Sequence, residues 1–193
     1  MRQLLSELPW FQSSSSSRHK KNRGLKVRWV LPNQLAVGRC IQSGEESTLK
    51  QAGIQSVLAL CDETEASIPS IVQEHFHVTR YPLPDSRQPV LLRPTDMMTA
   101  LNILHSNIVH HRPTYVHCLA GMERSPTLCI AYLCLFKGYG LWESLNWVKQ
   151  INPRTRPTEA QLDVVRSLID QQQETPPFMP HTSSVQQRTG LAS

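Results

Sequence analysis

The sequence predicts an α/β fold in which helices flank a central, mostly parallel β-sheet on both faces. Three features predict it. Short runs of β-branched and aliphatic residues alternate along the chain with longer segments of helical periodicity. Residues 54–60 are almost continuously apolar, which is typical of a parallel strand buried on both faces. A loop that starts at residue 117 follows a strand-like run, and open α/β sheets place ligand sites at the carboxyl ends of their strands.

The expected strands are short and are separated by turn residues. Residues 27–31 and 35–37 form a pair joined by a Pro-Asn turn. Further strands are expected over residues 54–60, 76–81 and 113–116. Pro82 and Pro84 stop the fourth of these strands and force a loop.

The helices follow from apolar periodicity and from end signals. They are expected over residues 43–52, 67–75, 94–110, 123–138, 141–151 and 158–172. Two of them begin with a capping-box pattern, Ser43 with Glu46 and Thr158 with Gln161. The longest apolar stretch, residues 128–136, is too short to cross a bilayer, so we expect a buried core helix there and no membrane span.

The 193 residues suffice for one domain with tails. We expect a Ser-rich basic leader over residues 1–24, a folded domain over 25–172 and a tail over 173–193 that does not fold. Six of the 20 basic residues lie between residues 18 and 28, which leaves 14 against 15 acidic ones. The basicity is thus local, and no nucleic acid partner is expected. The arm is a solvated leader, a contact for acidic partners or anionic lipid, or a transit segment.

Five cysteines, an odd number, indicate a reducing compartment rather than a disulfide framework, and we expect the cytoplasm. Neither a Cys-x-x-Cys pair nor a spaced histidine cluster supports a metal site, so no metal and no cofactor are expected.

The loop His-Cys-Leu-Ala-Gly-Met-Glu-Arg-Ser, residues 117–125, lies between a strand and a helix. Backbone N–H groups at a helix N-terminus can surround an anion. The helix dipole favours the thiolate of Cys118 and makes it a nucleophile. Arg124 can hold two oxygens of a phosphate, and Gly121 lets the backbone turn close to the ligand. The alternative is a buried structural cysteine with an incidental arginine.

This loop, His-Cys-x-x-Gly-x-x-Arg-Ser, resembles the signature of the cysteine-dependent protein tyrosine phosphatases, and the short chain resembles their dual-specificity branch. The resemblance covers about residues 27–170. It implies a catalytic domain of the dual-specificity phosphatase fold that hydrolyses phosphate esters through a phosphocysteine, without metal. A phosphoprotein is the expected substrate, with phosphotyrosine favoured and phosphoserine or phosphothreonine also open.

The resemblance implies a role for each site residue. Cys118 would attack phosphorus, Arg124 would stabilise the transition state, and Asp85 would be the general acid and then the base. Ser125 would bind the Cys118 sulfur, and His117 would favour the thiolate by bonding the loop backbone. The backbone donors to the phosphate would come from Leu119, Ala120, Gly121, Met122, Glu123 and Arg124.

Some of these assignments have alternatives. Asp85 could simply cap a turn, and Asp96 and Asp62 compete with it for the role of acid. Cys61, at the end of the 54–60 strand, could form a reversible disulfide with Cys118, as a cysteine there does in several similar phosphatases, or be a plain buried thiol.

Arg154 and Arg156 fall where similar phosphatases present a second anion contact, or they are solvated loop residues.

Phosphoinositide-directed relatives carry lysines in the signature loop, where this chain has Leu119, Met122 and Glu123. The acid disfavours a multiply phosphorylated inositol ring. Two other functions stay open: a non-catalytic phospho-binding module on the same fold, and a phosphatase of RNA 5′ ends or lipids.

Overall fold

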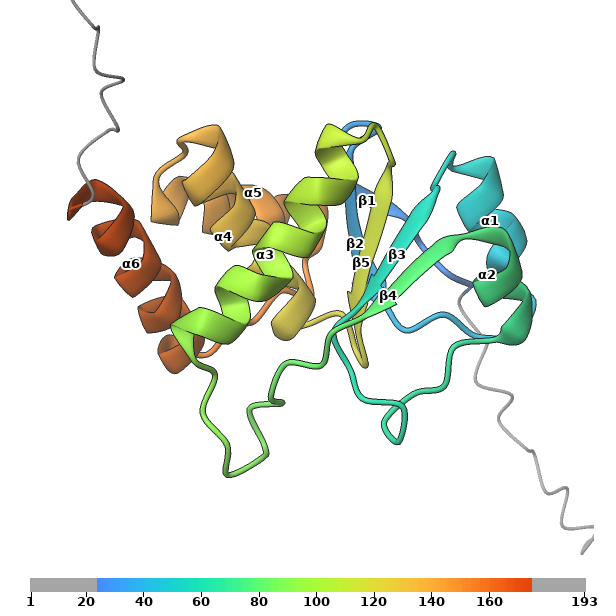
Figure 1. The fold of residues 1–193 in the computed structure, drawn as a ribbon, viewed down its shortest axis with the longest axis horizontal. Helices are drawn as coiled ribbons and strands as arrows, with labels where there is room; N and C mark the ends of the chain where they lie inside the picture. Colours follow the sequence, from blue (N-terminus) through green and yellow to red (C-terminus); the bar gives the residue numbers. More distant parts are fainter. Residues whose placement is uncertain (1–23, 175–193) are drawn as a thin grey trace, which may run out of the picture.

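A five-stranded sheet in the order β1-β2-β5-β3-β4 forms the centre of the computed structural model, which describes residues 24–174 (Figure 1). The strands are β1 (Arg28–Leu31), β2 (Leu35–Arg39), β3 (Ser56–Ala59), β4 (His77–Arg80) and β5 (Thr114–Cys118). Edge strand β1 pairs antiparallel with β2, and all the other neighbours are parallel. The mostly parallel sheet predicted from the sequence is confirmed. Apart from Gly24 and residues 173–174, the predicted leader and tail lie outside the described residues.

Helices cover both faces of this sheet, as predicted (Figure 1). One face carries α1 (Glu46–Gln51) and α2 (Ser70–His75). The other carries α3 (Pro94–Val109), α4 (Arg124–Lys137), α5 (Leu141–Ile151) and α6 (Glu159–Glu174). Within residues 24–174, no helix combines the length and the hydropathy that a membrane span requires.

Alternating side chains of β5 divide the core into two clusters. Tyr115 packs into the cluster under α1 and α2, and Val116 packs into the larger cluster under α3 to α6. The apolar stretch of residues 128–136 lies in α4, which packs against α3, α5 and α6. The helix is therefore buried on nearly every side, which explains why its sequence lacks a polar face.

The capping box predicted at Ser43 and Glu46 is wrong. Helix α1 begins only at Glu46, and no side chain caps it. Glu45 accepts hydrogen bonds from the Gln42 N–H and from the Arg39 guanidinium, and this ion pair sets where the helix starts. The box predicted at the start of α6 is confirmed, because Thr158 and Gln161 exchange side-chain to backbone hydrogen bonds.

Candidate active site

The loop between β5 and α4 turns its carbonyl groups outward. Three of them accept hydrogen bonds from neighbouring segments: Leu119 O from the Cys40 N–H (3.2 Å), Gly121 O from Asn152 Nδ2 (2.8 Å) and Met122 O from the Arg156 N–H (2.7 Å). All the described peptide bonds are trans, so the N–H that follows each carbonyl points the opposite way, into the loop. The loop thus forms a concave set of backbone donors at the N-terminus of α4, which suits an oxyanion.

Gly121 is required by this shape. Its φ is +68°, and a Cβ there would lie 2.6 Å from the backbone of Gly38 in β2. Both the left-handed backbone and the close approach exclude a side chain.

The Cys118 thiol lies at the base of the loop and is almost fully buried. The Ser125 hydroxyl is 3.4 Å from its sulfur and 3.2 Å from the carbonyl oxygen of Gly38. His117 Nδ1 lies 3.4 Å from the Cys118 carbonyl oxygen, while its buried Nε2 has no hydrogen-bond partner. Burial lowers the pKa of His117 to about 4, so the imidazole is neutral at ordinary pH.

Arg124 is buried and holds five hydrogen bonds. Its two terminal nitrogens bind both carboxylate oxygens of Glu65, at 2.7 and 2.8 Å, and one oxygen of Asp85, at 2.9 Å. The carbonyl oxygens of Leu60 and Leu83 accept the remaining two bonds. Burial lowers the pKa of Arg124, but the opposite charges around it outweigh that effect and raise it. The guanidinium is therefore a fixed cation beside Cys118.

Asp85 lies on the loop after β4, within reach of two arginines. It is ion-paired with Arg87 at 2.7 Å and with Arg124 at 2.9 Å. The Arg87 side chain lowers its pKa most, burial raises it, and Arg124 lowers it further, with a net decrease. The next residue, Ser86, donates a hydrogen bond to the Glu123 carboxylate, which ties this loop to the signature loop.

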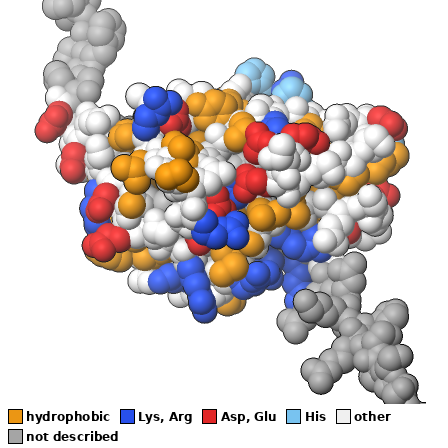
Figure 2. Space-filling model, turned by 90° about the horizontal axis from the view of Figure 1, so that it is seen from below, with side chains coloured by type: hydrophobic (Ala, Val, Ile, Leu, Met, Phe, Trp, Pro, Cys, Tyr) orange, Lys and Arg blue, Asp and Glu red, His pale blue; other side chains and the backbone are white. Residues whose placement is uncertain are grey.

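A cavity of about 200 Å³ opens over Cys118. Asp85, Arg87, Arg124 and the signature loop line it. Figure 2 shows the molecule from the end that carries these loops, with acidic and basic side chains close together near the centre of this face. Of the predicted residues, Cys118, Arg124 and Asp85 line this cavity, while the buried Ser125 and His117 contact Cys118 beneath it.

The predicted anion contacts separate in the structure. Arg154 lines a second, smaller cavity with Lys26 and Arg28, beside Ala120 and Gly121 of the loop. Arg156 contributes its backbone N–H to the loop, while its side chain is exposed.

The two competing acids are used elsewhere. Asp96 is ion-paired with Arg93 in the first turn of α3, and Asp62 accepts hydrogen bonds from Thr64. Neither lines the cavity over Cys118.

Cys61 follows β3, the parallel neighbour of β5, and is fully buried. Burial raises the pKa of its thiol to about 11. Both Cys61 and Cys118 are free thiols. In the described part of the chain, no group of three or more His, Cys, Asp and Glu side chains is arranged to hold a metal ion.

Sequence reasoning missed three residues that build this site. Glu65 anchors Arg124, Asn152 binds the loop through Gly121 O, and Gly38 makes room for the Tyr115 hydroxyl, which would lie 2.0 Å from a Cβ. A glycine inside a strand signals a close approach, so Gly38 had a readable signal. Glu65 had a weaker signal. It follows β3, and the carboxyl ends of the parallel strands β3 and β5 meet at the same edge of the sheet.

The family described as "Dual specificity phosphatase, catalytic domain" matches residues 37–173. Dual specificity protein phosphatase 14 of Mus musculus is 36% identical over 141 residues, which cover 72% of this chain and 66% of that protein. Phosphatidylglycerophosphate phosphatase PTPMT2 of Arabidopsis thaliana is 30% identical over 119 residues, 61% of this chain and 51% of that protein. The crystal structure of human tyrosine phosphatase-like serine/threonine/tyrosine-interacting protein superposes with a TM-score of 0.68 at 18% identity, covering 76% of this chain and 97% of that one.

Proposed function

Because the chain belongs to the dual specificity phosphatase family, which are cysteine-dependent hydrolases of phosphate monoesters, we propose that it dephosphorylates proteins. It removes phosphate from tyrosine, and from serine or threonine, through a phosphocysteine intermediate. The observation that supports this most is the Cys118 thiol at the base of a loop of inward N–H groups, with the Arg124 guanidinium held beside it.

Substrate binding displaces Asp85. In the free site Asp85 occupies one N–H of Arg124, whereas Glu65 holds the guanidinium through two bonds. An entering phosphate displaces the singly bonded Asp85 from Arg124 more easily than it displaces the doubly bonded Glu65. Its negative charge then raises the pKa of the released Asp85 carboxyl, which can carry the proton for the leaving oxygen.

Cys118 then attacks phosphorus, the phosphorus–oxygen bond to the substrate breaks, and Asp85 donates its proton to the alkoxide or phenoxide. Water hydrolyses the phosphocysteine in the second step, with Asp85 now accepting a proton from that water. The Ser125 hydroxyl, 3.4 Å from the sulfur, stabilises the departing thiolate. The neutral His117 holds the loop backbone and does not act as a base.

The shape and charge of the cavity favour a phosphorylated side chain. Its volume of about 200 Å³ is small, and Glu123 on its rim repels a second phosphate next to the first. The separate cavity lined by Lys26, Arg28 and Arg154 suits a second acidic group a few residues away on a peptide. The same basic cavity would suit a lipid headgroup, and the Arabidopsis relative is a phosphatidylglycerophosphate phosphatase, so lipid hydrolysis is the second candidate.

The test is hydrolysis of p-nitrophenyl phosphate with reductant and a metal chelator, by wild type, Cys118→Ser and Asp85→Asn. On p-nitrophenyl phosphate, wild type should turn over and the serine variant should be inactive. On a phosphoserine peptide, whose leaving group needs the proton, the activity of the Asp85 variant should fall about 10²–10⁴-fold. Wild type that binds phosphopeptides without hydrolysing them would be a phospho-binding module. A much higher rate on phosphatidylglycerophosphate vesicles than on phosphopeptides would select the lipid substrate.

Two further parts of the proposal concern redox state and surroundings. Five free thiols suit a reducing compartment such as the cytoplasm. Mild peroxide should produce a Cys61–Cys118 disulfide, more slowly than for an ordinary thiol because the high pKa of Cys61 keeps it protonated, and faster as pH rises. Mass spectrometry that finds Cys118 sulfonic acid with free Cys61 would exclude this protection. The basic arm remains a proposed contact for acidic partners.

A further inference from the structure

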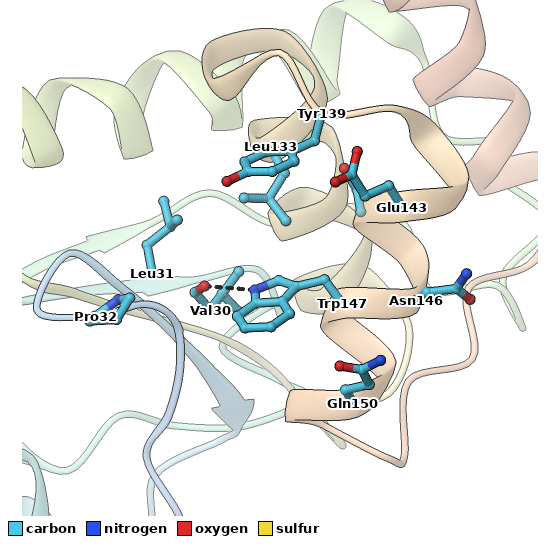
Figure 3. Close-up of a pocket in the computed structure, with 10 residues that line it drawn as sticks. Val30, Leu31, Pro32, Leu133, Tyr139, Glu143, Asn146, Trp147 and Gln150 are labelled. Carbon is cyan, nitrogen blue, oxygen red and sulfur yellow. Dashed lines mark hydrogen bonds between the residues drawn. The ribbon is translucent and has the colours of Figure 1, made fainter.

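A third cavity, of about 520 Å³, lies away from the signature loop, between α5 and the turn that joins β1 to β2 (Figure 3). Leu31 and Pro32 line it on the side of the turn, Leu133 comes from α4, and Tyr139 and Trp147 face them. We call these five residues the α5 groove. It shares no residue with the cavity over Cys118.

The two aromatic rings of the α5 groove are exposed, and a hydrogen bond fixes the ring of Trp147. Tyr139 is 46% and Trp147 43% exposed, although both are large apolar side chains. The Trp147 indole N–H donates to the Val30 carbonyl oxygen at 2.9 Å, so the ring is held in place before any ligand arrives. A prearranged aromatic surface loses little entropy on binding, and covering it removes apolar area from water.

The C-terminal chain leaves the described structure close to this groove. Gln172 Nε2, near the end of α6, donates to the Leu135 carbonyl oxygen at 3.3 Å, which places the end of α6 at the last turn of α4. Leu133, on the groove, lies two residues earlier and therefore on the opposite side of the same helix. The last described residue, Glu174, is thus separated from the groove by about the width of one helix, about 10 Å.

We propose that the α5 groove binds the chain's own residues 175–180, Thr-Pro-Pro-Phe-Met-Pro. Three prolines in six residues favour the polyproline II helix, which rises about 3.1 Å per residue and would extend about 19 Å. That length crosses the last turn of α4 and brings Phe178 and Pro180 to Tyr139 and Trp147. Proline-rich segments dock in grooves lined by aromatic rings, which is the chemistry that the α5 groove offers.

Another apolar segment of the chain, residues 4–11, is the main competitor. It joins the fold at Gly24, which lies beside Ala120 and Gly121 of the signature loop. To reach the groove, this segment must return along the whole of β1 from that end. The C-terminal segment starts one helix width away, and its tether gives it the higher effective concentration. This inference does not depend on the proposed phosphatase activity.

The experiment follows the indole N–H signal of Trp147 by nuclear magnetic resonance in the full chain and in a chain that ends at Glu174. Removing residues 175–193 should shift the signal, and a synthetic peptide of residues 174–183 should restore it. The peptide should bind the full chain at least about ten-fold more weakly than the shortened one, because the tethered segment already occupies the groove.

Two variants and one modified peptide localise the contact. In the shortened chain, Tyr139→Ser should weaken peptide binding at least about ten-fold, as should Phe178→Ala in the peptide. Trp142→Ala, an exposed tryptophan of α5 that does not line the groove, should leave binding unchanged. A Trp147 signal that ignores removal of the tail would overturn the proposal. So would a signal that responds only to removal of residues 1–23, or only to dilution of the full chain, which would indicate a second copy.

Discussion

Mild acid should destabilise the fold through one buried histidine. The His117 side chain is 1% exposed, and burial lowers its pKa to about 4 from an ordinary value of 6.5. Between these two values the unfolded chain binds a proton at this position and the folded chain does not. The stability that depends on neutral His117 is therefore complete above pH 6.5 and is lost as the pH falls toward 4.

The two pKa values determine the size of the effect. Lowering the pH from 7.5 to 5.5 should reduce the free energy of unfolding by about 1.4 kcal/mol, roughly ten-fold in the folding equilibrium. The carboxyls of Glu65 and Asp85 act in a different range. Their pKa values are lowered from 4.5 and 3.8, so the stability that they contribute is present above those values and is lost only at lower pH.

Urea unfolding at pH 7.5, 6.5 and 5.5 measures how the free energy of unfolding depends on pH. Wild type is compared with His117→Gln, whose amide does not titrate. The loss of stability in wild type should exceed that in the variant by about 1.4 kcal/mol, with unchanged dependence on urea. Equal losses in the two proteins would refute the reasoning. If the variant does not fold, the imidazole resonances of folded wild type provide the same test, since those of His117 should not titrate between pH 7.5 and 5.5.

Three further substitutions probe the site. Glu65→Gln removes a charged partner of Arg124, which should lower the unfolding free energy by about 1.5–3 kcal/mol. Because the guanidinium is then misplaced, activity should also fall at least ten-fold. Wild-type stability and activity in this variant would contradict the role of the ion pair. Arg87→Ala removes the main cause of the low pKa of Asp85, so the high-pH limb of kcat/KM should move to higher pH, whereas Arg87→Lys should move it less. Gly121→Ala must distort the loop, and about 10²-fold of activity should be lost even where circular dichroism shows an intact fold; retained activity would refute the fit of the loop.

Much of the fold could be predicted because local pattern and global structure agree. The apolar run at residues 54–60 contains β3, and the loop at residues 117–125 connects β5 to α4 as expected. The starts of the helices agree with the sequence patterns less often. The same capping-box pattern succeeded at Thr158 and failed at Ser43, where Glu45, the residue before α1, is ion-paired with Arg39 of β2. Tertiary contacts of that kind leave no periodic signal in a sequence.

The anchor of Arg124 shows a second limit. Three acids lie shortly after β3, at residues 62, 63 and 65, and the sequence does not distinguish them. In the fold, Asp62 accepts a hydrogen bond from the Thr64 N–H and Glu63 is ion-paired with Arg80. Of the three acids, only Glu65 binds Arg124. The choice depends on the turn that the chain makes between β3 and α2, which side-chain chemistry alone does not determine.

Glu65 and Asp85, the two acids that bind Arg124, differ in their contacts with it. Glu65 binds both terminal nitrogens, while Asp85 binds one and shares its carboxylate with the exposed Arg87. In the mechanism that we propose, an entering phosphate competes for the same nitrogens and displaces Asp85 more easily than Glu65. Glu65 would then keep the guanidinium aimed at the phosphate, and the released Asp85 carboxyl would have a higher pKa than it has in the free site. On this proposal, binding of the substrate creates the general acid that the reaction needs.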